Sequence, residues 1–315
     1  MNMGLRQTIQ IGACLGAVGV CYLVAGTVTA PRGDLAAVEF VFGKVGLRDG
    51  EFSYPRAMAI SPVDGRVFVI DKTARVQRFS PKGKHEKTWR MPAWDNGKPT
   101  GVYADSEGRI WVADTHYARI IVYDRDGAEQ FRFGERGEGP GQFIFPTAIA
   151  RDADGNVFVS EYGGNDRISK FTPDLKYIKS FANRASGEGW TDRPQSMVID
   201  GDGVIWVADS CGHRICRYDL EGRFLGELRP TRDGTIDELN YPFGLAFDGD
   251  GNLLIADRGH SRIVRMAKDG RMLGSWGAVG REVGRLAQPW AVAMGANGLI
   301  YCLDSWNNRV EVIDW

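Results

Sequence analysis

PFGLAFDGDGNLLIAD, residues 242–257, is the stretch that decides the fold of this chain. It contains two apolar runs separated by aspartate and glycine, begins with a proline and ends with a carboxylate. An Asp-Gly pair forms a tight hairpin turn because glycine adopts a positive φ without a steric penalty, so the two runs are predicted to be antiparallel strands. A polar loop then leads from Arg258 to a third strand that begins at Arg262, and residues 272–276 form a fourth. The unit is a four-stranded antiparallel sheet.

The same pattern occurs six times along the chain. The opening prolines are separated by 44, 47, 48, 48 and 47 residues: Pro55, Pro99, Pro146, Pro194, Pro242 and Pro289. The closing carboxylates are separated by 43, 47, 48, 48 and 47 residues: Asp71, Asp114, Glu161, Asp209, Asp257 and Asp304. A period in the forties built from strands is typical of a propeller blade, whereas helical repeats would show apolar residues three to four apart. The sequence predicts an all-β, six-bladed β-propeller over residues 32–315.

The last copy of the repeat ends at Trp315 after its third strand, so its outer strand must come from elsewhere. Residues 36–43, just before the first copy, contain the apolar run Phe40-Val-Phe42. The segments that follow the outer strands support this register, because residues 43–52 and 134–143 have glycine and phenylalanine at matching positions. We expect the N-terminal strand to close the propeller.

The repeat resembles that of the NHL family of six-bladed β-propellers. The segments VADTHYARI, residues 112–120, and VADSCGHRI, residues 207–215, match the Ala-Asp, polar-loop and Arg-Ile portion of that repeat. The resemblance covers about residues 36–315 and implies the fold. Because propellers of this kind act as enzymes, as ligand-binding proteins and as docking platforms, the resemblance alone does not select a function.

Charge excludes one class of partner. The chain has 39 lysine and arginine residues against 40 aspartate and glutamate residues, and it has no glycine loop ahead of a helix that would hold phosphate groups. We therefore expect no nucleic-acid partner.

The N-terminal segment, residues 1–31, is predicted to be a transmembrane anchor or a signal segment. No charged side chain occurs from Gln7 to Pro31, and residues 11–30 would span about 30 Å as a helix, the thickness of a bilayer core. Arg6 precedes this run, which places the N-terminus in the cytoplasm and the propeller on the periplasmic or extracytoplasmic side of the cell membrane. Gly12 and Gly16 form a G-x-x-x-G pair that favours packing against another membrane helix, and hence a retained anchor. Cleavage after Ala30 is the alternative.

Three histidines occupy equivalent loops after the second strand: His116, His213 and His260. Imidazoles gathered near the propeller axis could hold a divalent metal whose bound water acts as a nucleophile or base. The alternative is structural, since they follow their carboxylates by two, four and three residues and need not point to one centre. Glu161, Tyr162 and Trp306 lie where the repeat is irregular and are further ligand candidates.

The NHL family includes the lyase that completes peptide C-terminal amidation, which uses propeller histidines on zinc. This resemblance implies such a role for His213 alone, because only His213 matches in repeat position.

Most blades also carry an aspartate followed by an arginine at the start of the third strand: Asp114 with Arg119, Asp209 with Arg214, Asp257 with Arg262, and Asp304 with Arg309. Residues that recur in nearly every blade are expected to have a structural role that all blades share. We expect these pairs to tie adjacent blades by charge-assisted hydrogen bonds.

Three cysteines follow the N-terminal segment. Cys302 takes the place of a buried valine in a second strand and is expected to be a small core residue. Cys211 and Cys216 flank His213 and are either free, or joined in a disulfide, or part of a metal site.

The sequence thus predicts a membrane-tethered propeller that acts as a protein-docking module, an accessory subunit of a larger membrane complex with other membrane-protein subunits as partners. Trp94, Trp190 and Trp306 are either docking contacts or residues packed on their own blades. The alternatives are a metal-dependent lyase or hydrolase that uses the histidine-bearing face and a sensor of a small ligand. No cofactor is expected apart from the metal of the lyase hypothesis.

Overall fold

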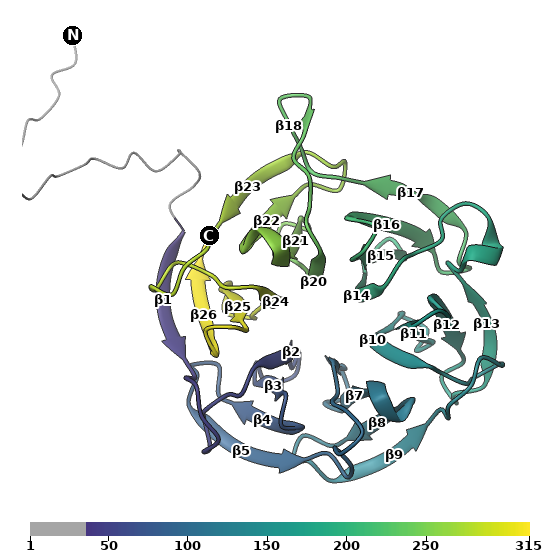
Figure 1. The fold of residues 1–315 in the computed structure, drawn as a ribbon, viewed down its shortest axis with the longest axis horizontal. Helices are drawn as coiled ribbons and strands as arrows, with labels where there is room; N and C mark the ends of the chain where they lie inside the picture. Colours follow the sequence, from purple (N-terminus) through teal and green to yellow (C-terminus); the bar gives the residue numbers. More distant parts are fainter. Residues whose placement is uncertain (1–35) are drawn as a thin grey trace, which may run out of the picture. The chain divides into compact units, whose positions relative to one another are not determined.

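A computed structural model describes residues 36–315, which form six four-stranded antiparallel sheets around a central axis (Figure 1). The predicted all-β six-bladed propeller is confirmed. Blade 1 contains β2 (Pro55–Ile60), β3 (Val67–Asp71), β4 (Arg75–Phe79) and β5 (His85–Arg90). Blade 2 contains β6 (Gly101–Ala104), β7 (Ile110–Asp114), β8 (Arg119–Tyr123) and β9 (Glu129–Phe133). Blade 3 contains β10 (Phe145–Arg151), β11 (Val157–Tyr162), β12 (Arg167–Phe171) and β13 (Tyr177–Phe181).

The second half of the ring repeats this order. Blade 4 contains β14 (Pro194–Ile199), β15 (Val204–Asp209), β16 (Arg214–Asp219) and β17 (Phe224–Leu228). Blade 5 contains β20 (Pro242–Phe247), β21 (Leu253–Asp257), β22 (Arg262–Met266) and β23 (Met272–Trp276). Blade 6 contains β24 (Pro289–Met294), β25 (Ile300–Asp304) and β26 (Arg309–Asp314). Three short 3-10 turns, η1 (Thr115–Tyr117), η2 (Arg184–Ser186) and η3 (Arg258–His260), complete the elements.

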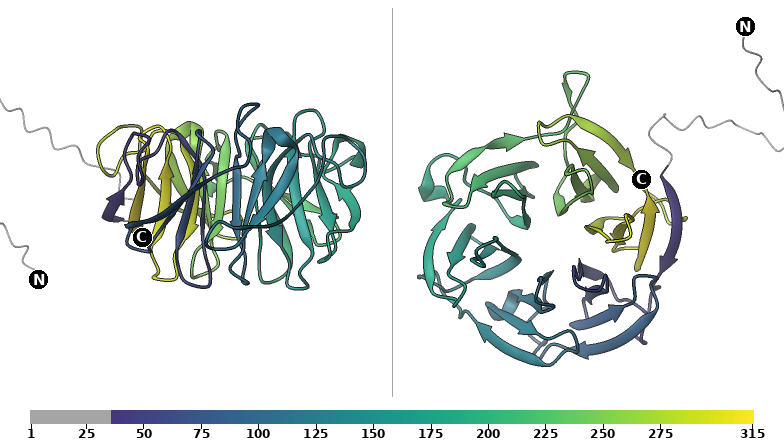
Figure 2. Two further views of the ribbon diagram at one scale, coloured as in Figure 1. Left: turned by 90° about the horizontal axis from the view of Figure 1, so that it is seen from below. Right: turned by 180° about the vertical axis from the view of Figure 1, so that it is seen from behind.

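The N-terminal strand closes the ring, as the sequence predicts. β1 (Ala37–Phe42) pairs with β26 in antiparallel register, with Ala37 opposite Asp314 and Phe42 opposite Val310. Blade 6 is therefore built from both ends of the described chain, which lie side by side in the ribbon (Figure 2).

Strand direction gives the propeller two distinct faces. Each inner strand begins opposite the end of its second strand, as Pro55 lies opposite Asp71, and the two strands join at a turn at the other end, near Ile60 and Val67. We call the end with the opening prolines and the loops after the second strands the loop face. The end with the Asp-Gly turns is the turn face. Because Ala37 pairs with Asp314 and not with Arg309, the chain enters and leaves the propeller at the turn face.

Hydrophobic cores lie between neighbouring blades. The second strands are buried along their whole length in most blades, for example Leu253–Asp257 and Ile300–Asp304. Cys302 is fully buried in the core that joins blades 5 and 6, as expected for a small apolar residue.

A small hairpin between blades 4 and 5 has no counterpart in the repeat. β18 (Thr231–Arg232) pairs with β19 (Thr235–Ile236), and the hairpin projects from the ring (Figure 1). The backbone N–H of Thr231 donates to the carbonyl of Gly270 at 2.9 Å, which fixes the base of the hairpin beside the outer strand of blade 5.

Within residues 36–315, no helix is long and apolar enough to cross a bilayer. The predicted anchor or signal segment, residues 1–31 with Gly12 and Gly16, lies outside the described residues and stays a prediction.

Candidate functional site

A channel runs along the propeller axis between the six inner strands. Each inner strand pairs with a second strand on one side only, so its other edge faces the channel. The channel encloses a cavity of about 380 Å³ lined by residues of all six inner strands. Gly101 shows how closely these strands approach, because a Cβ atom there would lie 1.7 Å from the carbonyl oxygen of Thr147 in the next blade. The narrow axis therefore requires glycine at this position.

At the loop face the channel opens into a second cavity of about 240 Å³, which we call the mouth pocket. Its lining residues come from blades 1, 2, 3, 4 and 6 and from the loops beside their strands: Arg56, Thr100, His116, Tyr162, Arg193, Gln195 and Trp290. Arg56, Thr100, Gln195 and Trp290 line the channel as well. The mouth pocket and the channel are therefore continuous.

Two arginines of the mouth pocket lack the carboxylate partners that the repeat arginines have. The guanidinium carbon of Arg56 lies 5.7 Å from the ring centroids of Tyr54 and of Trp290, and that of Arg193 lies 4.8 Å from the centroid of Tyr162. The Nε atoms of both arginines are buried and have no hydrogen-bond partner within the described part of the chain. Burial lowers the pKa of Arg56. The nearby Tyr54 and Tyr162 oppose that shift, and the positive charge of Arg193 adds to it. The two positive charges therefore act on each other in one pocket.

Two further buried polar atoms of the mouth pocket have no partner among residues 36–315: Oε1 of Gln195 and Nε1 of Trp290. Gln195 is only 6% exposed. Buried polar groups in proteins are nearly always hydrogen-bonded, and one left without a protein partner points to bound water, an ion or a ligand. Four such groups around one cavity mark the mouth pocket as the candidate binding site.

Backbone strain accompanies the residues that surround the mouth. The residues directly before four of the opening prolines have positive φ: Tyr54 at 52°, Arg193 at 62°, Tyr241 at 53° and Gln288 at 51°. Non-glycine residues rarely adopt this conformation, and a following proline normally favours an extended backbone. Strain of this kind persists only where the surrounding structure imposes it, and it clusters at functional sites.

Three aromatic side chains lie beside the mouth on the loop face, next to blades 5, 6 and 1, and Tyr54 among them is half-buried. Trp306 is 58% exposed, and its Nε1 donates to the hydroxyl of Tyr54 at 2.7 Å. Tyr241 is 41% exposed, and its ring centroid lies 4.7 Å from that of His213. We call Tyr54, Tyr241 and Trp306 the aromatic rim.

The three candidate histidines have separate partners. His116 lines the mouth pocket, where its Nδ1 accepts from the backbone N–H of Lys98 at 3.1 Å. His213 Nδ1 accepts from the backbone N–H of Tyr241 at 3.2 Å, and His260 Nδ1 lies 2.8 Å from Oδ2 of Asp257.

No group of three or more His, Cys, Asp or Glu residues in the described chain could hold a metal ion. The residues therefore do not fit the zinc centre that the resemblance to the amidating lyase implies, and the role of His213 in such a centre gains no support.

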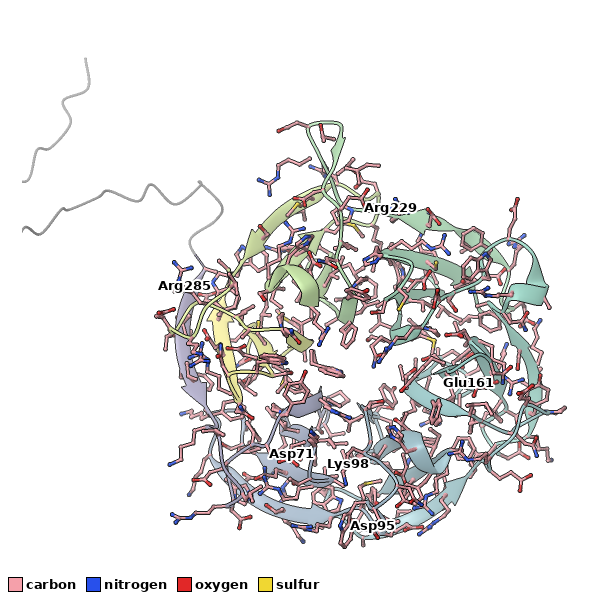
Figure 3. All side chains as sticks on the ribbon, viewed as in Figure 1. Asp71, Asp95, Lys98, Glu161, Arg229 and Arg285 are labelled. Carbon is pink, nitrogen blue, oxygen red and sulfur yellow. The ribbon has the colours of Figure 1, made fainter. Side chains whose placement is uncertain are left out.

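The other irregular residues have different environments. Glu161 is fully buried, bonded to Arg167 at 2.6 Å and to the backbone N–H of Ile144. It is thus the blade 3 member of the repeating carboxylates, and Asp71 and Glu161 lie in different blades (Figure 3). Tyr162 lies in the mouth pocket, stacked on Phe145 with 5.3 Å between ring centroids.

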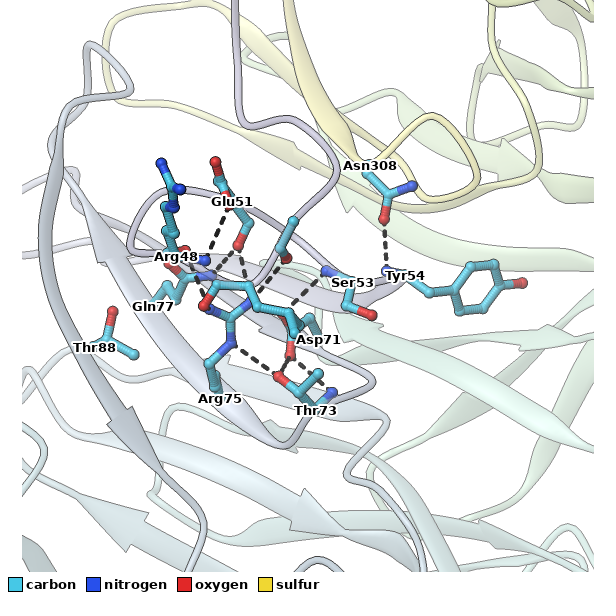
Figure 4. A network of polar contacts seen from close by, with 12 residues as sticks. Arg48, Glu51, Ser53, Tyr54, Asp71, Thr73, Arg75, Gln77, Thr88 and Asn308 are labelled. Atoms are coloured by element: carbon cyan, nitrogen blue, oxygen red, sulfur yellow. Dashed lines mark hydrogen bonds and ion pairs between the residues drawn. The ribbon is translucent and has the colours of Figure 1, made fainter.

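The predicted Asp and Arg pairs lie in direct contact. The carboxylate to Nε distances are 2.8 Å for Asp114 with Arg119, 2.7 Å for Asp209 with Arg214, 2.8 Å for Asp257 with Arg262, and 2.9 Å for Asp304 with Arg309. The arginines also bind the linkers between blades: Arg309, for example, donates to the carbonyls of Arg281, Glu282 and Arg285. In blade 1 the linker 43–52 is held in the same way by Arg75 (Figure 4).

Blade 2 departs from this scheme. In five blades the carboxylate accepts a backbone N–H from the residue two before the opening proline, as Asp209 accepts from Asp192 at 2.6 Å. Oδ1 of Asp114 instead has no hydrogen-bond partner in the described structure. Blade 2 is therefore held less tightly at its carboxylate than the other blades.

The two other candidate docking tryptophans lie outside the aromatic rim. The guanidinium of Arg90 lies 5.4 Å from the ring of Trp94, which is 38% exposed. Trp190 lies between Arg184 and Arg214, at 4.7 and 5.7 Å, and is partly buried. Both tryptophans therefore pack against nearby arginine side chains of the propeller itself.

The cysteines flanking His213 are not bonded to each other. Cys211, Cys216 and Cys302 are free thiols, and Cys216 is fully buried. Burial raises the pKa of the Cys216 thiol to about 12, so this side chain behaves as a core residue.

Sequence reasoning missed Arg56, Arg193, Gln195 and Trp290. A signal was present, because the residues on either side of the opening prolines differ from blade to blade while the rest of the repeat stays similar. The residues beside the opening prolines, which vary between blades, therefore indicate the position of the channel mouth.

The fold and the site define a six-bladed β-propeller with a pocket at one end of its channel. An NHL repeat model matches residues 96–123 and 191–218. The chain therefore contains NHL repeats, and NHL repeat proteins are among its relatives.

Known proteins are similar to this chain to differing extents. "Protein brain tumor" of Drosophila melanogaster is 28% identical over 130 residues, 41% of this chain and 12% of its own length. NHL repeat-containing protein 3 of Mus musculus is 24% identical over 187 residues, 54% of this chain and 53% of its own length. The chain thus spans about half, or much less, of these relatives. A streptogramin B lyase structure, with a TM-score of 0.62 and 15% identity over 87% of this chain and 97% of that chain, shares the fold.

Proposed function

We propose that this protein is a docking module that binds a partner protein through the aromatic rim of its loop face. The observation that carries the proposal is the exposure of Trp306 and Tyr241 at 58% and 41% on one face. Tryptophan, tyrosine and arginine dominate the residues that contribute most to protein interfaces. NHL repeats are consistent with a protein-binding role.

The rim residues are held in place before any partner binds. Trp306 donates through its side chain to Tyr54 and through its backbone N–H to the carbonyl of Ala287 at 3.1 Å. The ring of Tyr54 lies edge-on to Trp290, with 5.7 Å between centroids. Ordering of side chains opposes association, so a surface that is already ordered binds at a lower entropic cost.

We further propose that residues 1–31 tether the propeller to a membrane as an accessory subunit of a larger complex. The chain enters β1 at the turn face, where Ala37 pairs with Asp314. The described chain therefore begins at the face opposite the aromatic rim, and this supports the proposal of docking through the rim.

A photo-crosslinking residue at position 306 tests the docking surface in the cells that make this protein. We expect one discrete crosslinked species from position 306. The matched control is position 63, since Val63 is 48% exposed on the turn face. Equal crosslinking from both positions, or crosslinking from position 63 alone, would exclude the loop face as the docking surface.

A metal-dependent lyase or hydrolase gains no specific support from the site. One structural neighbour is a streptogramin B lyase, but at 15% identity that likeness shows the fold alone. The mouth pocket does favour a role in binding a small ligand.

A further inference from the structure

We propose that the mouth pocket is an oxyanion-binding site in which Arg56 and Arg193, with Gln195 and Trp290 beside them, bind the carboxylate or phosphate group of a small ligand. The site adjoins the aromatic rim at Tyr54, whose ring lies under Arg56. It goes beyond the docking role because its ligand is a small anion.

The first support is an uncompensated positive charge. The repeat arginines that start the third strands each pair with a buried carboxylate, as Arg214 pairs with Asp209 at 2.7 Å. Arg56 and Arg193 form no ion pair within residues 36–315, and both line the same cavity of about 240 Å³. Two like charges that are partly buried together raise the free energy of the empty pocket. An anion placed between them would relieve that repulsion.

The nearby carboxylates are already engaged with other groups. Oδ1 of Asp166 accepts the backbone N–H of Arg193 at 2.7 Å. Glu161 is bound to Arg167 at 2.6 Å. Within residues 36–315, neither guanidinium group of the mouth pocket forms an ion pair with these or other carboxylates.

Hydrogen-bond donors without partners converge on the same cavity. The Nε atoms of Arg56 and Arg193 and Nε1 of Trp290 are all buried donors that lack an acceptor in the described chain. Oxyanions accept several hydrogen bonds at once, and arginine binds carboxylate and phosphate through parallel N–H groups. Gln195, 6% exposed, lines the same cavity, and its Nε2 group can donate to an anion, whereas its unpartnered Oε1 is an acceptor.

The aromatic walls hold the guanidinium groups without neutralising them. Arg56 lies over Tyr54 and Trp290, and Arg193 lies over Tyr162. A cation–π contact positions an arginine side chain but leaves its charge available to an anion. The rest of the ligand has space below, because the mouth pocket opens into the channel cavity of about 380 Å³.

Titration calorimetry of the detergent-solubilised full chain at low ionic strength tests this site with two probes, sodium phosphate and sodium acetate. We expect saturable binding of at least one probe with one site per chain. Arg56→Gln and Arg193→Gln should each weaken that binding at least tenfold. Arg223→Gln, a substitution of a 77% exposed arginine at the turn face, should leave the binding unchanged. The probe that binds more tightly identifies a phosphate or a carboxylate as the natural group.

Two results would overturn the proposal: no saturable binding of either anion to the wild-type chain, or equal weakening by Arg223→Gln, which would mark nonspecific attraction. Gln195→Leu provides a second variant that keeps both charges, and it too should weaken binding. A matching circular dichroism spectrum and unfolding midpoint show that each variant is folded. Neither titration involves a protein partner, so its outcome is separate from that of the crosslinking experiment.

Discussion

The guanidinium of Arg75 binds the carboxylate of Asp71 at 2.6 Å, and both side chains are almost completely buried, at 4% and 1% exposure. The same guanidinium donates to the carbonyls of Leu47 and Glu51 in the linker from the preceding blade, at 2.7 and 3.0 Å. Oδ2 of Asp71 accepts the backbone N–H of Ser53 at 3.2 Å. One ion pair thus fixes the path of the chain from one blade to the next.

Breaking this pair should strongly destabilise the propeller. Arg75→Met leaves a buried carboxylate without its partner and frees the linker carbonyls, so we expect a loss of about 3 to 5 kcal/mol in the free energy of unfolding. Chemical denaturation checks this value. Lys176→Ala is the control, because its ion pair with Asp174 is exposed, and it should leave the midpoint unchanged. A loss from Arg75→Met no larger than that of the control would contradict the structural role.

The blades should differ in how much they depend on their carboxylate. Asp209 accepts from Arg214 and from the backbone N–H of Asp192, whereas Oδ1 of Asp114 has no partner in the described chain. Asp209→Ala should therefore destabilise the protein more than Asp114→Ala, by about 1.5 kcal/mol for the additional bond to a charged group. Equal losses in the two variants would show that the backbone bond contributes nothing.

Acid should unfold the propeller partly through Asp105. Burial opposes ionisation of this carboxyl, but hydrogen bonds from Trp111 and Arg109 outweigh it, and the pKa of Asp105 is lowered. A lowered pKa in the folded state contributes stability above the unfolded value of about 3.9, and that stability is lost as the pH falls through the folded pKa. Stability should therefore decline below about pH 4.

Denaturation midpoints measured from pH 7 to acid check this dependence. Asp105→Asn should flatten the acid decline, whereas Asp269→Asn, at a 67% exposed position, should not. An unchanged slope in Asp105→Asn would show that this carboxyl does not couple to folding.

Backbone strain at the loop face can be measured at Tyr241, whose φ is 53°. Tyr241→Gly and Tyr241→Ala remove the same contacts, but only glycine adopts this conformation without a penalty. We expect the glycine variant to be more stable than the alanine variant by about 1 kcal/mol. Calorimetric unfolding of the two variants gives this difference directly, and a more stable alanine variant would show that the site carries no strain.

The fold could be predicted from the sequence because the strand and turn pattern of one blade occurs six times. The Asp-Gly turns, as at Asp248, and the buried second strands set the period, and Phe40-Val-Phe42 supplied the closing strand. The small hairpin at Thr231 could not be predicted, because it interrupts the repeat only once and its strands are two residues long.

The candidate site was harder to predict than the fold. His116 and Tyr162 were predicted as metal or ligand groups, and both line the mouth pocket. Arg56 and Arg193 come from blades 1 and 4 and meet only when the ring closes, so no local pattern joins them. His213 and His260 occupy equivalent repeat positions, which suggested a shared metal site. In the described structure they do not form a metal-binding group.

The most direct test of the docking proposal compares tagged full-length chains isolated from the membranes of the cells that make the protein. The wild type and the Val63→Ser control should retain a stoichiometric partner chain after mild detergent extraction. The double variant Trp306→Ala, Tyr241→Ala should lose that partner while remaining folded. Retention of the same partner in the double variant would contradict docking through the aromatic rim.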